Sequence, residues 1–260
     1  MILELKHITA RVNEGTAEEK EILKDICLSV EKGDFITLLG TNGAGKSTLL
    51  NVINGSLAPS SGSLSVNGRD ITKLPAVKRA GFISQVFQDP KAGTAPRMTV
   101  AENLLLARRR GLSRRLKLRG LKNAVPEFTK MTEMLPNGLS RHLNTFTGDL
   151  SGGQRQTLSF LMATTGSPEI LLLDEHTAAL DPKTSLQLME LTRRTVEENN
   201  LTCIMITHQL KDALKYGNRT IILNDGRIVL DASGTEKAAL SEEEILGYFA
   251  NRERCEKQRP

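Results

Sequence analysis

The segment from Gly40 to Ser47 has residue types and a spacing that suit the binding of phosphate groups. It matches the pattern G-x-x-x-x-G-K-[ST], in which glycines let successive backbone N–H groups turn inward around an anion. Lys46 can then reach the β- and γ-phosphates of a nucleotide, and the Ser47 hydroxyl can bind Mg²⁺. An ordinary glycine-rich turn is the alternative. The predicted nucleotide-binding residues are Gly40, Thr41, Asn42, Gly43, Ala44, Gly45, Lys46, Ser47 and Thr48.

Two adjacent carboxylates, Asp174 and Glu175, are the second candidate for chemistry. They follow an apolar run at residues 170–173, which predicts a buried strand that delivers both acids to the carboxyl edge of a sheet. Asp174 is placed to hold Mg²⁺ through water, and Glu175 to orient or deprotonate the water that attacks a γ-phosphate. Apolar strands often end in an acid, so the pair alone is weak evidence for a catalytic site. The phosphate loop earlier in the chain strengthens this interpretation.

A mostly parallel sheet is needed to position these two motifs. The apolar run at 35–39 predicts a buried strand before Gly40, and the apolar spacing after Ser47 predicts a helix. The predicted strands are residues 3–12, 22–30, 35–39, 63–66, 81–87, 170–174, 203–207, 220–223 and 228–230. The expected fold class is α/β, with a P-loop NTPase core of mostly parallel strands and flanking helices, an antiparallel β flank and an inserted α-helical subdomain.

Helical spacing replaces the strand pattern between residues 99 and 163, where the leucine pairs 112/116 and 118/121 are four and three residues apart. A final helix is predicted over 241–252, because Ser241 and Glu244 have the spacing of a capping box. The expected domains are a RecA-like nucleotide-binding core with its β flank over 1–97 and 164–235, a helical subdomain over 98–163, and a C-terminal helix and tail over 236–260.

Composition and charge describe a globular protein with one local anomaly. Of the 260 residues 39% are apolar, the formal net charge is +5, and no apolar run reaches 18 residues. The chain start lacks the features of a signal peptide, so we expect a cytosolic location. The basic run at 108–122 holds eight Lys or Arg and no acid. Binding to anionic lipid or nucleic acid is one interpretation, but a solvated helix face is favoured.

The three cysteines, Cys27, Cys203 and Cys255, are widely spaced and form no C-x-x-C pair. This spacing predicts neither a disulfide framework nor a structural zinc site. Cys27 and Cys203 lie in apolar runs and are expected in the core, whereas Cys255 lies in an end that is expected to fray.

Further motifs give the chain a family resemblance. Residues 150–154, Leu-Ser-Gly-Gly-Gln, resemble the signature motif of ATP-binding cassette (ABC) ATPases. Gln88 is similar to the family's Q-loop glutamine, Asp181 in Ala-Leu-Asp to its D-loop, and His208 to its switch histidine. Singly, Gln88 would more often be a polar loop residue and His208 a helix cap. Together with the phosphate loop and the acidic strand, the motifs stand in the family's order over about residues 1–235.

The resemblance implies a head-to-tail homodimer in which ATP lies between the phosphate loop of one copy and the signature of the other. Gln88 would contact Mg²⁺ or the attacking water and couple the site to membrane subunits, and His208 would contact the γ-phosphate. The implied catalytic residues are thus Glu175, His208 and Gln88, and the implied metal ligands are Ser47, Gln88 and Asp174. The residues expected to act in trans are Ser151, Gly152, Gly153, Gln154 and Asp181. The spacing agrees, since Ser151 to Gly153 would open a helix whose amides bind an anion.

Two positions depart from the family pattern. Val12 stands where many members carry an aromatic residue that stacks on adenine, so apolar contact or the loop at 13–21 would hold the base, and ATP selectivity is expected to be loose. His176 stands where a proline is usual. It is either inert, which we favour, or in contact with the catalytic water.

The chain is similar to a subgroup of bacterial importer ATPases that work with a permease and a substrate-binding lipoprotein, some of them linked to tryptophan or tyrosine uptake. This implies an ATP- and Mg²⁺-dependent ATPase at the inner face of the cell membrane, bound to separate permease subunits, with no nucleic acid expected. An exporter ATPase is the alternative. A non-transport role on nucleic acid or ribosomes is disfavoured, because only 62 residues separate Gln88 from Ser151, too few for a long coiled coil.

Overall fold

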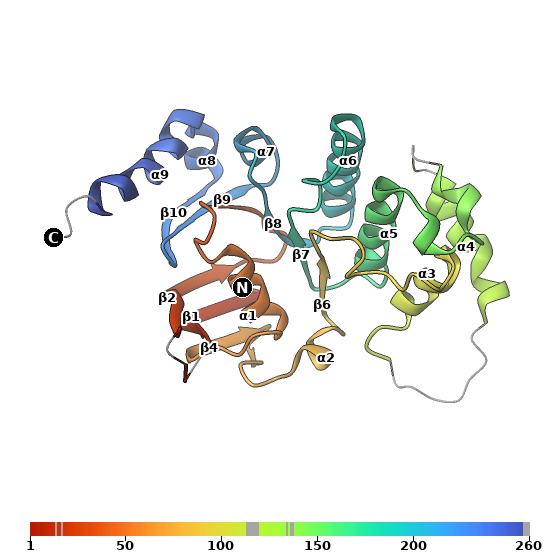
Figure 1. The fold of residues 1–260 in the computed structure, drawn as a ribbon, viewed down its shortest axis with the longest axis horizontal. Coiled ribbons are helices and arrows are strands. Elements are labelled where there is room, and N and C mark those ends of the chain that lie inside the picture. The colour runs from red at the N-terminus through yellow and green to blue at the C-terminus, as the bar shows by residue number, and fades with distance from the viewer. Residues whose placement is uncertain (14, 17, 113–119, 134, 136–137, 257–260) are drawn as a thin grey trace. The chain divides into compact units, whose positions relative to one another are not determined.

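The computed structural model of the chain describes residues 1–13, 15–16, 18–112, 120–133, 135 and 138–256, with side chains described up to residue 249. The chain divides into two compact units. The first combines Met1–Arg79 with Asn200–Pro260, and the second is Ala80–Asn199. Figure 1 labels most of the elements of both units. The predicted domain boundaries at 97, 163 and 235 rest on sequence patterns and stay a prediction.

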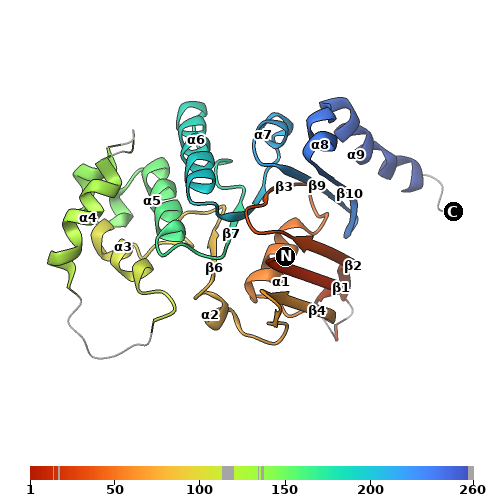
Figure 2. The ribbon, with the colours of Figure 1, turned by 180° about the vertical axis from the view of Figure 1, so that it is seen from behind.

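The first unit contains an antiparallel sheet, visible from both sides in Figure 1 and Figure 2. Its strands are β1 Leu3–Val12, β2 Lys20–Val30, β4 Ser61–Val66 and β5 Arg69–Asp70. The order is β2-β1-β4-β5, and Leu3 of the central strand β1 pairs with Val30 on one side and Val66 on the other. This sheet is the predicted antiparallel flank, and β5 is a strand that the sequence patterns did not indicate.

The other strands of the first unit are β3 Phe35–Leu39, β8 Thr202–Ile206, β9 Arg219–Asn224 and β10 Arg227–Ser233. β3 runs parallel to both β8 and β9, whereas β10 is antiparallel to β9. All five residues of β3 are buried, as expected of a central parallel strand. The helices of this unit are α1 Lys46–Asn54, α2 Ala76–Arg79, α7 Leu210–Lys215, α8 Gly234–Ala239 and α9 Glu242–Glu256. Leu39 and Ile222 of the strands pack with Ala213 of α7 and Ile245 of α9.

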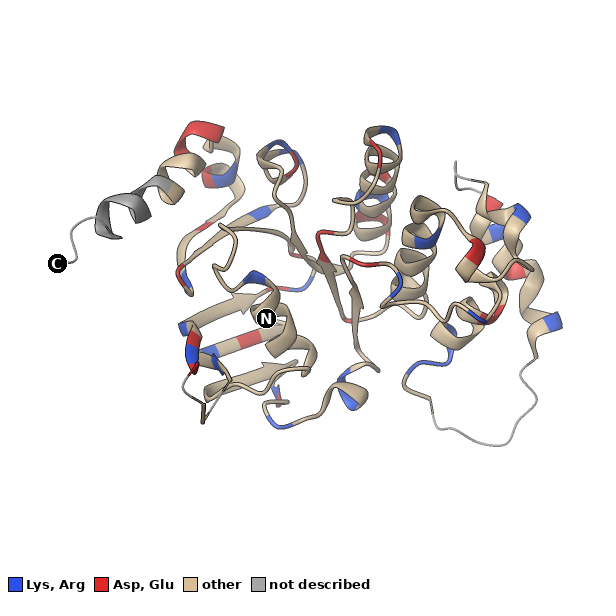
Figure 3. Cartoon of the chain, in the orientation of Figure 1, with Lys and Arg blue, Asp and Glu red and all other residues tan. Residues whose placement is uncertain are grey.

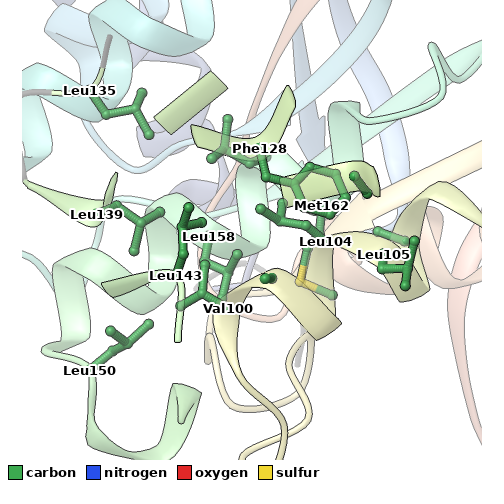
Figure 4. Close-up of a cluster of buried hydrophobic side chains, with 14 residues drawn as sticks. Val100, Leu104, Leu105, Phe128, Leu135, Leu139, Leu143, Leu150, Leu158 and Met162 are labelled. Carbon is green, nitrogen blue, oxygen red and sulfur yellow. The ribbon is translucent and has the colours of Figure 1, made fainter. Parts of the chain in front are cut away.

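The second unit contains two parallel strands and a group of helices. The strands are β6 Ile83–Val86 and β7 Ile170–Asp174. The helices are α3 Val100–Arg108, α4 Leu121–Glu133, α5 Gly152–Thr164 and α6 Pro182–Glu198, with short 3₁₀ turns at Leu139–His142 and Thr147–Asp149. Figure 4 shows an apolar cluster to which α3 contributes Leu104, α4 contributes Phe128 and α5 contributes Leu158, all fully buried. This core holds the predicted helical insertion together.

The expected α/β fold class is confirmed, and the predicted strands are all present with small shifts at their ends. The predicted capping box of the last helix is also confirmed, because Ser241 N donates to Glu244 Oε2 at 2.8 Å and Glu244 N donates to Ser241 Oγ at 3.2 Å. The leucine spacing that began at Leu112 was misleading. Leu112 lies in a bend and is 67% exposed, and it follows Gly111, whose left-handed conformation with φ of 76° comes after α3 has ended. Leu116 and Leu118 lie outside the described residues.

The basic run at 108–122 is used within the protein at two of its described positions. Arg108 forms an ion pair with Glu127 of α4 at 2.8 Å. Arg110 is half-buried and donates to Ser84 Oγ at 2.5 Å and to the carbonyl oxygen of Met162 at 3.2 Å. Its burial lowers the pKa of its guanidinium. Figure 3 shows acidic as well as basic residues on α3 and α4. The contacts of Arg110 correct the interpretation of this run as only a solvated face. Residues 113–119 lie outside the described part.

The buried side chain of Arg79 links several loops of the first unit to the end of α1 through hydrogen bonds. The side chain is 1% exposed, and each of its nitrogens donates to backbone carbonyl oxygens at 2.6 to 3.0 Å. The accepting carbonyls belong to Val52, Ile53, Ile71, Thr72 and Leu74. Two of them lie in the last turn of α1, where helix carbonyls need donors from outside the helix. Arg79 therefore fixes the helix that follows the phosphate loop.

Candidate functional site

The phosphate loop connects β3 to α1, as predicted. Different physical reasons require glycine at different positions of this loop. Gly43 and Gly45 adopt φ of 78° and 103°, a region that L-residues disfavour, and a Cβ on Gly40 would lie 2.4 Å from the carbonyl oxygen of Leu223. The loop can therefore keep this tight path only with glycine at these positions.

Lys46 and the start of α1 give this loop a positive electrostatic character. The Lys46 Nζ donates to the carbonyl oxygens of Gly40 at 2.8 Å and Thr41 at 3.0 Å, which keeps the ammonium within the loop. Among the described residues no side chain caps α1, whose N-cap is Gly45, and its first turn carries no acid. The amides and dipole at this helix end are thus suited to an anion such as a nucleotide phosphate.

His208 lies at the same edge of the first unit as the phosphate loop. Strands β3 and β8 are parallel with Leu38 paired to Ile206, so Gly40 and His208 each follow their paired residue by two positions. Thr207 N donates to the Leu38 carbonyl oxygen at 3.4 Å, which extends the pairing. The cap of helix α7 is Gln209. His208 therefore does not have the alternative role of a helix cap. Its side chain is exposed.

The acidic pair and Gln88 lie at the equivalent edge of the second unit. Strands β6 and β7 are parallel with Val86 paired to Leu173, which brings residues 87–88 and 174–175 to the same ends of neighbouring strands. Asp174 and Glu175 are half-buried and Gln88 is exposed, so all three reach solvent.

The backbone of Glu175 is in the left-handed region with φ of 45°, which is uncommon for this residue type. The Ala178 N–H donates to the Glu175 carbonyl oxygen at 3.0 Å and closes a turn directly after β7. A side chain held in such a backbone conformation marks a candidate functional position.

The signature residues open helix α5, as predicted. Ser151 is its N-cap and forms a capping box, because Gln154 N donates to Ser151 Oγ and Ser151 N donates to Gln154 Oε1, both at 3.2 Å. A Cβ on Gly153 would lie 2.7 Å from Thr184 Cγ2, so this glycine permits close packing of α5 on α6. By contrast, no described atom lies within 4 Å of a Cβ built on Gly152. The helix start at Gly152 is therefore open to an incoming group.

Asp181 is the N-cap of α6, where its carboxylate accepts from Thr184 N at 3.1 Å. Hydrogen bonds from Thr184 lower the pKa of the Asp181 carboxyl, so it is ionised at neutral pH. The charge also stabilises the helix start, and Pro182 suits the first helical position. These two residues signal the start of α6, which the sequence reasoning did not name.

Gln156 is a residue of this region that the sequence reasoning missed. It lies in α5 and is 1% exposed, and its Nε2 donates to the carbonyl oxygen of Phe87, the residue before Gln88, at 3.2 Å. Its Oε1 has no hydrogen-bond partner among the described residues. Gln156 thus joins the signature helix to the segment that carries Gln88. The sequence did offer a signal, because Gln156 lies five residues after Ser151 in the predicted helix. A polar residue at a buried position of a helix needs a hydrogen-bond partner.

His176 is buried, and its environment favours the neutral ring. Its Nε2 lies 3.0 Å from Thr192 Oγ1, and that hydroxyl donates to the carbonyl oxygen of Leu188, so it accepts from the histidine. Phe160 stacks on the ring at a centroid distance of 6.3 Å. Burial lowers the pKa of His176 to about 4. This packing accounts for His176 as a structural residue, in line with the favoured inert role.

Val12 ends strand β1 and is half-buried. The neighbouring Arg11 forms ion pairs at 3.2 Å with Glu19 of the following loop and with Glu21 of β2. Residues 14 and 17 of this loop lie outside the described part. The prediction that Val12 or this loop holds the adenine base stays a prediction.

Several known proteins are similar to this chain. The family described as ABC transporter matches residues 23–178, more than half of the chain. The chain is 45% identical over 252 residues to the tyrosine transport ATP-binding protein of Clostridioides difficile (strain R20291), covering 95% of this chain and 98% of that protein. It is 33% identical over 260 residues to the methionine import ATP-binding protein MetN 2 of Enterococcus faecalis (strain ATCC 700802 / V583), covering 97% of this chain and 71% of that protein.

A solved structure is similar over nearly the whole chain. It is the ATP-binding cassette MJ0796 in a dimeric post-hydrolysis state bound to ADP and Pi, with a TM-score of 0.76, 30% sequence identity, and coverage of 89% of this chain and 98% of that one. An α/β fold with a phosphate loop and an acidic strand end defines a P-loop ATPase. The chain belongs to the ABC transporter family, and it is an ATPase cassette of that family.

Proposed function

We propose that two copies of this chain hydrolyse ATP between them and thereby drive the import of a small solute such as an amino acid. The observation that carries the hydrolytic part is the position of Glu175, whose left-handed backbone places it in a turn at the carboxyl end of β7. Its carboxylate would orient or deprotonate the attacking water, with Gln88 and His208 as further contacts of the water and the γ-phosphate.

Phosphate binding would be the task of the first unit. Backbone N–H groups of the loop and the start of α1 would hold the phosphates, and Lys46 would exchange its two carbonyl partners for phosphate oxygens. The second copy would contribute Ser151, Gly152, Gly153 and Gln154 at the start of α5, with Asp181 communicating across the dimer. The open space in front of Gly152 supports this role.

Mg²⁺ fits the oxygen donors that these residues offer, namely the Ser47 hydroxyl, the Gln88 amide oxygen and the Asp174 carboxylate. Ser47 and Gln88 are exposed and Asp174 is half-buried. When bound, the ion would neutralise charge on the phosphates during transfer. The protein's own part is to hold these oxygens at the ends of buried strands and at the start of α1.

The transport part of the proposal is supported by the relatives. The first relative is a tyrosine transport ATP-binding protein that matches this chain almost end to end, and the second is a methionine import ATP-binding protein. Among the described residues, no helix combines the length and the apolar character needed to cross a bilayer. The proposed partners are separate permease subunits that bind this chain at the inner face of the membrane, and through them a substrate-binding lipoprotein.

The hydrolytic proposal is tested by ATP turnover and oligomeric state, with and without MgATP, for the wild type and Glu175→Gln. We expect the wild type to turn over ATP, and Glu175→Gln to bind ATP, stall and accumulate as a dimer. Glu133→Gln is a matched control, because Glu133 is exposed at the end of α4. Turnover by Glu175→Gln at the wild-type rate would refute the assignment of the base.

The direction of transport is tested by purifying the membrane complex from cells that express the chain with an affinity tag. Co-purification of a permease together with a substrate-binding lipoprotein is the expected result. A permease without such a lipoprotein would favour an exporter, and a complex with no membrane protein would contradict the transport role.

A further inference from the structure

Three side chains with different metal-binding atoms meet on the exposed face of the antiparallel sheet. His7 comes from β1, and Asp25 and Cys27 come from β2. The His7 Nδ1 lies 2.8 Å from Asp25 Oδ1 and 3.7 Å from Cys27 Sγ, and the three ligand atoms lie within 4.8 Å of one another. All three residues are exposed. This corrects the expectation that Cys27 lies in the core.

Irregular strand pairing produces this meeting. Leu5 pairs with Leu28 and Ile8 with Ile26, so two residues of β1 lie opposite the single residue Cys27. The extra residue is His7, whose φ is 51°. Such a bulge turns a side chain away from the regular alternation of the strand.

A second irregularity on the facing strand completes the arrangement. Ile8 pairs with Ile26 but Ala10 with Leu23, so one residue of β1 lies opposite two residues of β2, and Asp25 among them has φ of 56°. On the other side of β1, a Cβ on Gly62 would lie 2.3 Å from the His7 carbonyl oxygen, so only glycine admits the bulge there. Residues with left-handed backbone thus carry two of the three ligands, which is typical of functional positions.

The distance between the His7 nitrogen and the Cys27 sulfur suits a tetrahedral ion, whereas the Asp25 oxygen has to move to complete the coordination. With Zn–N and Zn–O near 2.0 Å and Zn–S near 2.3 Å, a tetrahedral site needs about 3.6 Å between nitrogen and sulfur and about 3.3 Å between nitrogen and oxygen. The observed 3.7 Å between His7 and Cys27 meets the first requirement. The hydrogen-bonded His7–Asp25 pair would open by about half an ångström as the ion replaces the shared proton.

The surroundings of the cluster leave its ligands available to a cation. The two nearest lysines in sequence pair elsewhere, Lys6 with Glu4 at 3.0 Å and Lys24 with Asp225 at 2.8 Å. The His7 backbone N–H donates to Cys27 Sγ at 3.4 Å, and a donor of this kind stabilises a thiolate ligand. Since the site is exposed, water can occupy a fourth position.

We propose that His7, Asp25 and Cys27 bind one borderline-soft divalent cation, with Zn²⁺ as the best match, and that the ion links β1 to β2. This metal site is additional to the ATPase activity and needs no nucleotide. Three ligands of mixed type with one open position are typical of Zn²⁺ and of its spectroscopic substitute Co²⁺.

The experiment is a Co²⁺ titration of the purified full-length chain without nucleotide or Mg²⁺, followed by competition with Zn²⁺. We expect one Co²⁺ per chain with a strong thiolate-to-metal absorption band that Zn²⁺ removes. Cys27→Ser should abolish the band, and His7→Gln should weaken the affinity by about tenfold or more. Because these side chains are exposed, both variants should fold, which circular dichroism will verify.

Matched controls use the same kinds of substitution elsewhere. Cys255→Ser and His142→Gln should leave the band and the stoichiometry unchanged. A second readout is thermal unfolding, because an ion that binds only the folded chain raises the Tm. Zn²⁺ should raise the Tm of the wild type and not that of Cys27→Ser. A wild type without the band, or a Cys27→Ser variant that keeps it, would overturn the proposal.

Discussion

At the scale of single residues, His176 should make stability depend on pH. Its folded-state pKa of about 4 lies below the ordinary value of 6.5, so the folded chain binds fewer protons than the unfolded chain between these values. Stability is therefore complete above about pH 6.5 and falls as the pH drops towards 4. At pH 5 the loss relative to pH 7 should be about 2 kcal/mol.

The measurement is urea unfolding at pH 7 and pH 5 for the wild type and His176→Gln, which cannot titrate. The wild type should lose about 2 kcal/mol more than His176→Gln over this interval. His142→Gln serves as the control, because His142 is only partly buried. Equal losses in the wild type and His176→Gln would contradict the neutral, buried state of this ring.

Gly152 allows the proposed trans role of the signature to be separated from folding. A Cβ at this position meets no described atom within 4 Å and Gly152 is the first residue of α5, so Gly152→Ala should be at least as stable as the wild type. If ATP bound to the second copy lies against this helix start, the added methyl group should lower turnover by about tenfold or more. Unfolding and turnover measured on one preparation test this pair of outcomes.

The matched variant is Gly153→Ala, which places a Cβ 2.7 Å from Thr184 Cγ2 and should lose stability as well as activity. A Gly152→Ala variant with full turnover would argue against a nucleotide at this position.

At the scale of elements, Arg79 should decide the stability of the helix that follows the phosphate loop. Arg79→Met leaves five carbonyl acceptors, of which those of Val52, Ile53 and Ile71 are buried, without this donor group, so the free energy of unfolding should fall by about 3 kcal/mol or more. Arg79→Lys keeps the charge but offers fewer donors and should recover only part of the loss. Denaturant unfolding gives both values, with the exposed Lys78→Met as the control, whose effect should stay within about 0.5 kcal/mol.

How well the sequence predicted each element depended on whether the signal was local. The strand before Gly40, the two acids at the end of β7 and the cap of α5 each follow from a few consecutive residues, and the structure has them where expected. Cys27 could not be placed in this way, because its exposure results from the bulged pairing of β1 with β2. The hydrogen bond between Gln156 and Phe87 likewise joins residues far apart in the sequence, which a periodic pattern does not report.

At the scale of the whole molecule, the proposed head-to-tail dimer makes a quantitative prediction for mixed chains. Lys46→Ala removes the phosphate-loop cation and Gly152→Glu places a negative charge at the signature, so each variant alone should be inactive. In an equal mixture half of the dimers hold one chain of each kind, and one of their two composite sites has both parts intact. The mixture should therefore recover about a quarter of the wild-type turnover if the sites act independently.

The same mixing experiment with Lys46→Ala and Glu175→Gln is the control. Lys46 and Glu175 of one chain are proposed to act on the same nucleotide. Each composite site of a mixed dimer therefore holds one of the two defects, and no recovery is expected. Recovery in neither mixture would show that the signature acts within its own chain.

The pairing of Leu38 with Ile206 sets a limit on how chain length can vary during evolution. A deletion of one residue from β8 would move His208 by about 3.3 Å and reverse the face to which it points, whereas the phosphate loop after β3 would stay in place. Insertions and deletions among relatives should therefore avoid the segment from Thr202 to His208 and gather in the loop between β1 and β2. A variant that shortens β8 by a single residue should therefore lose its ATPase activity.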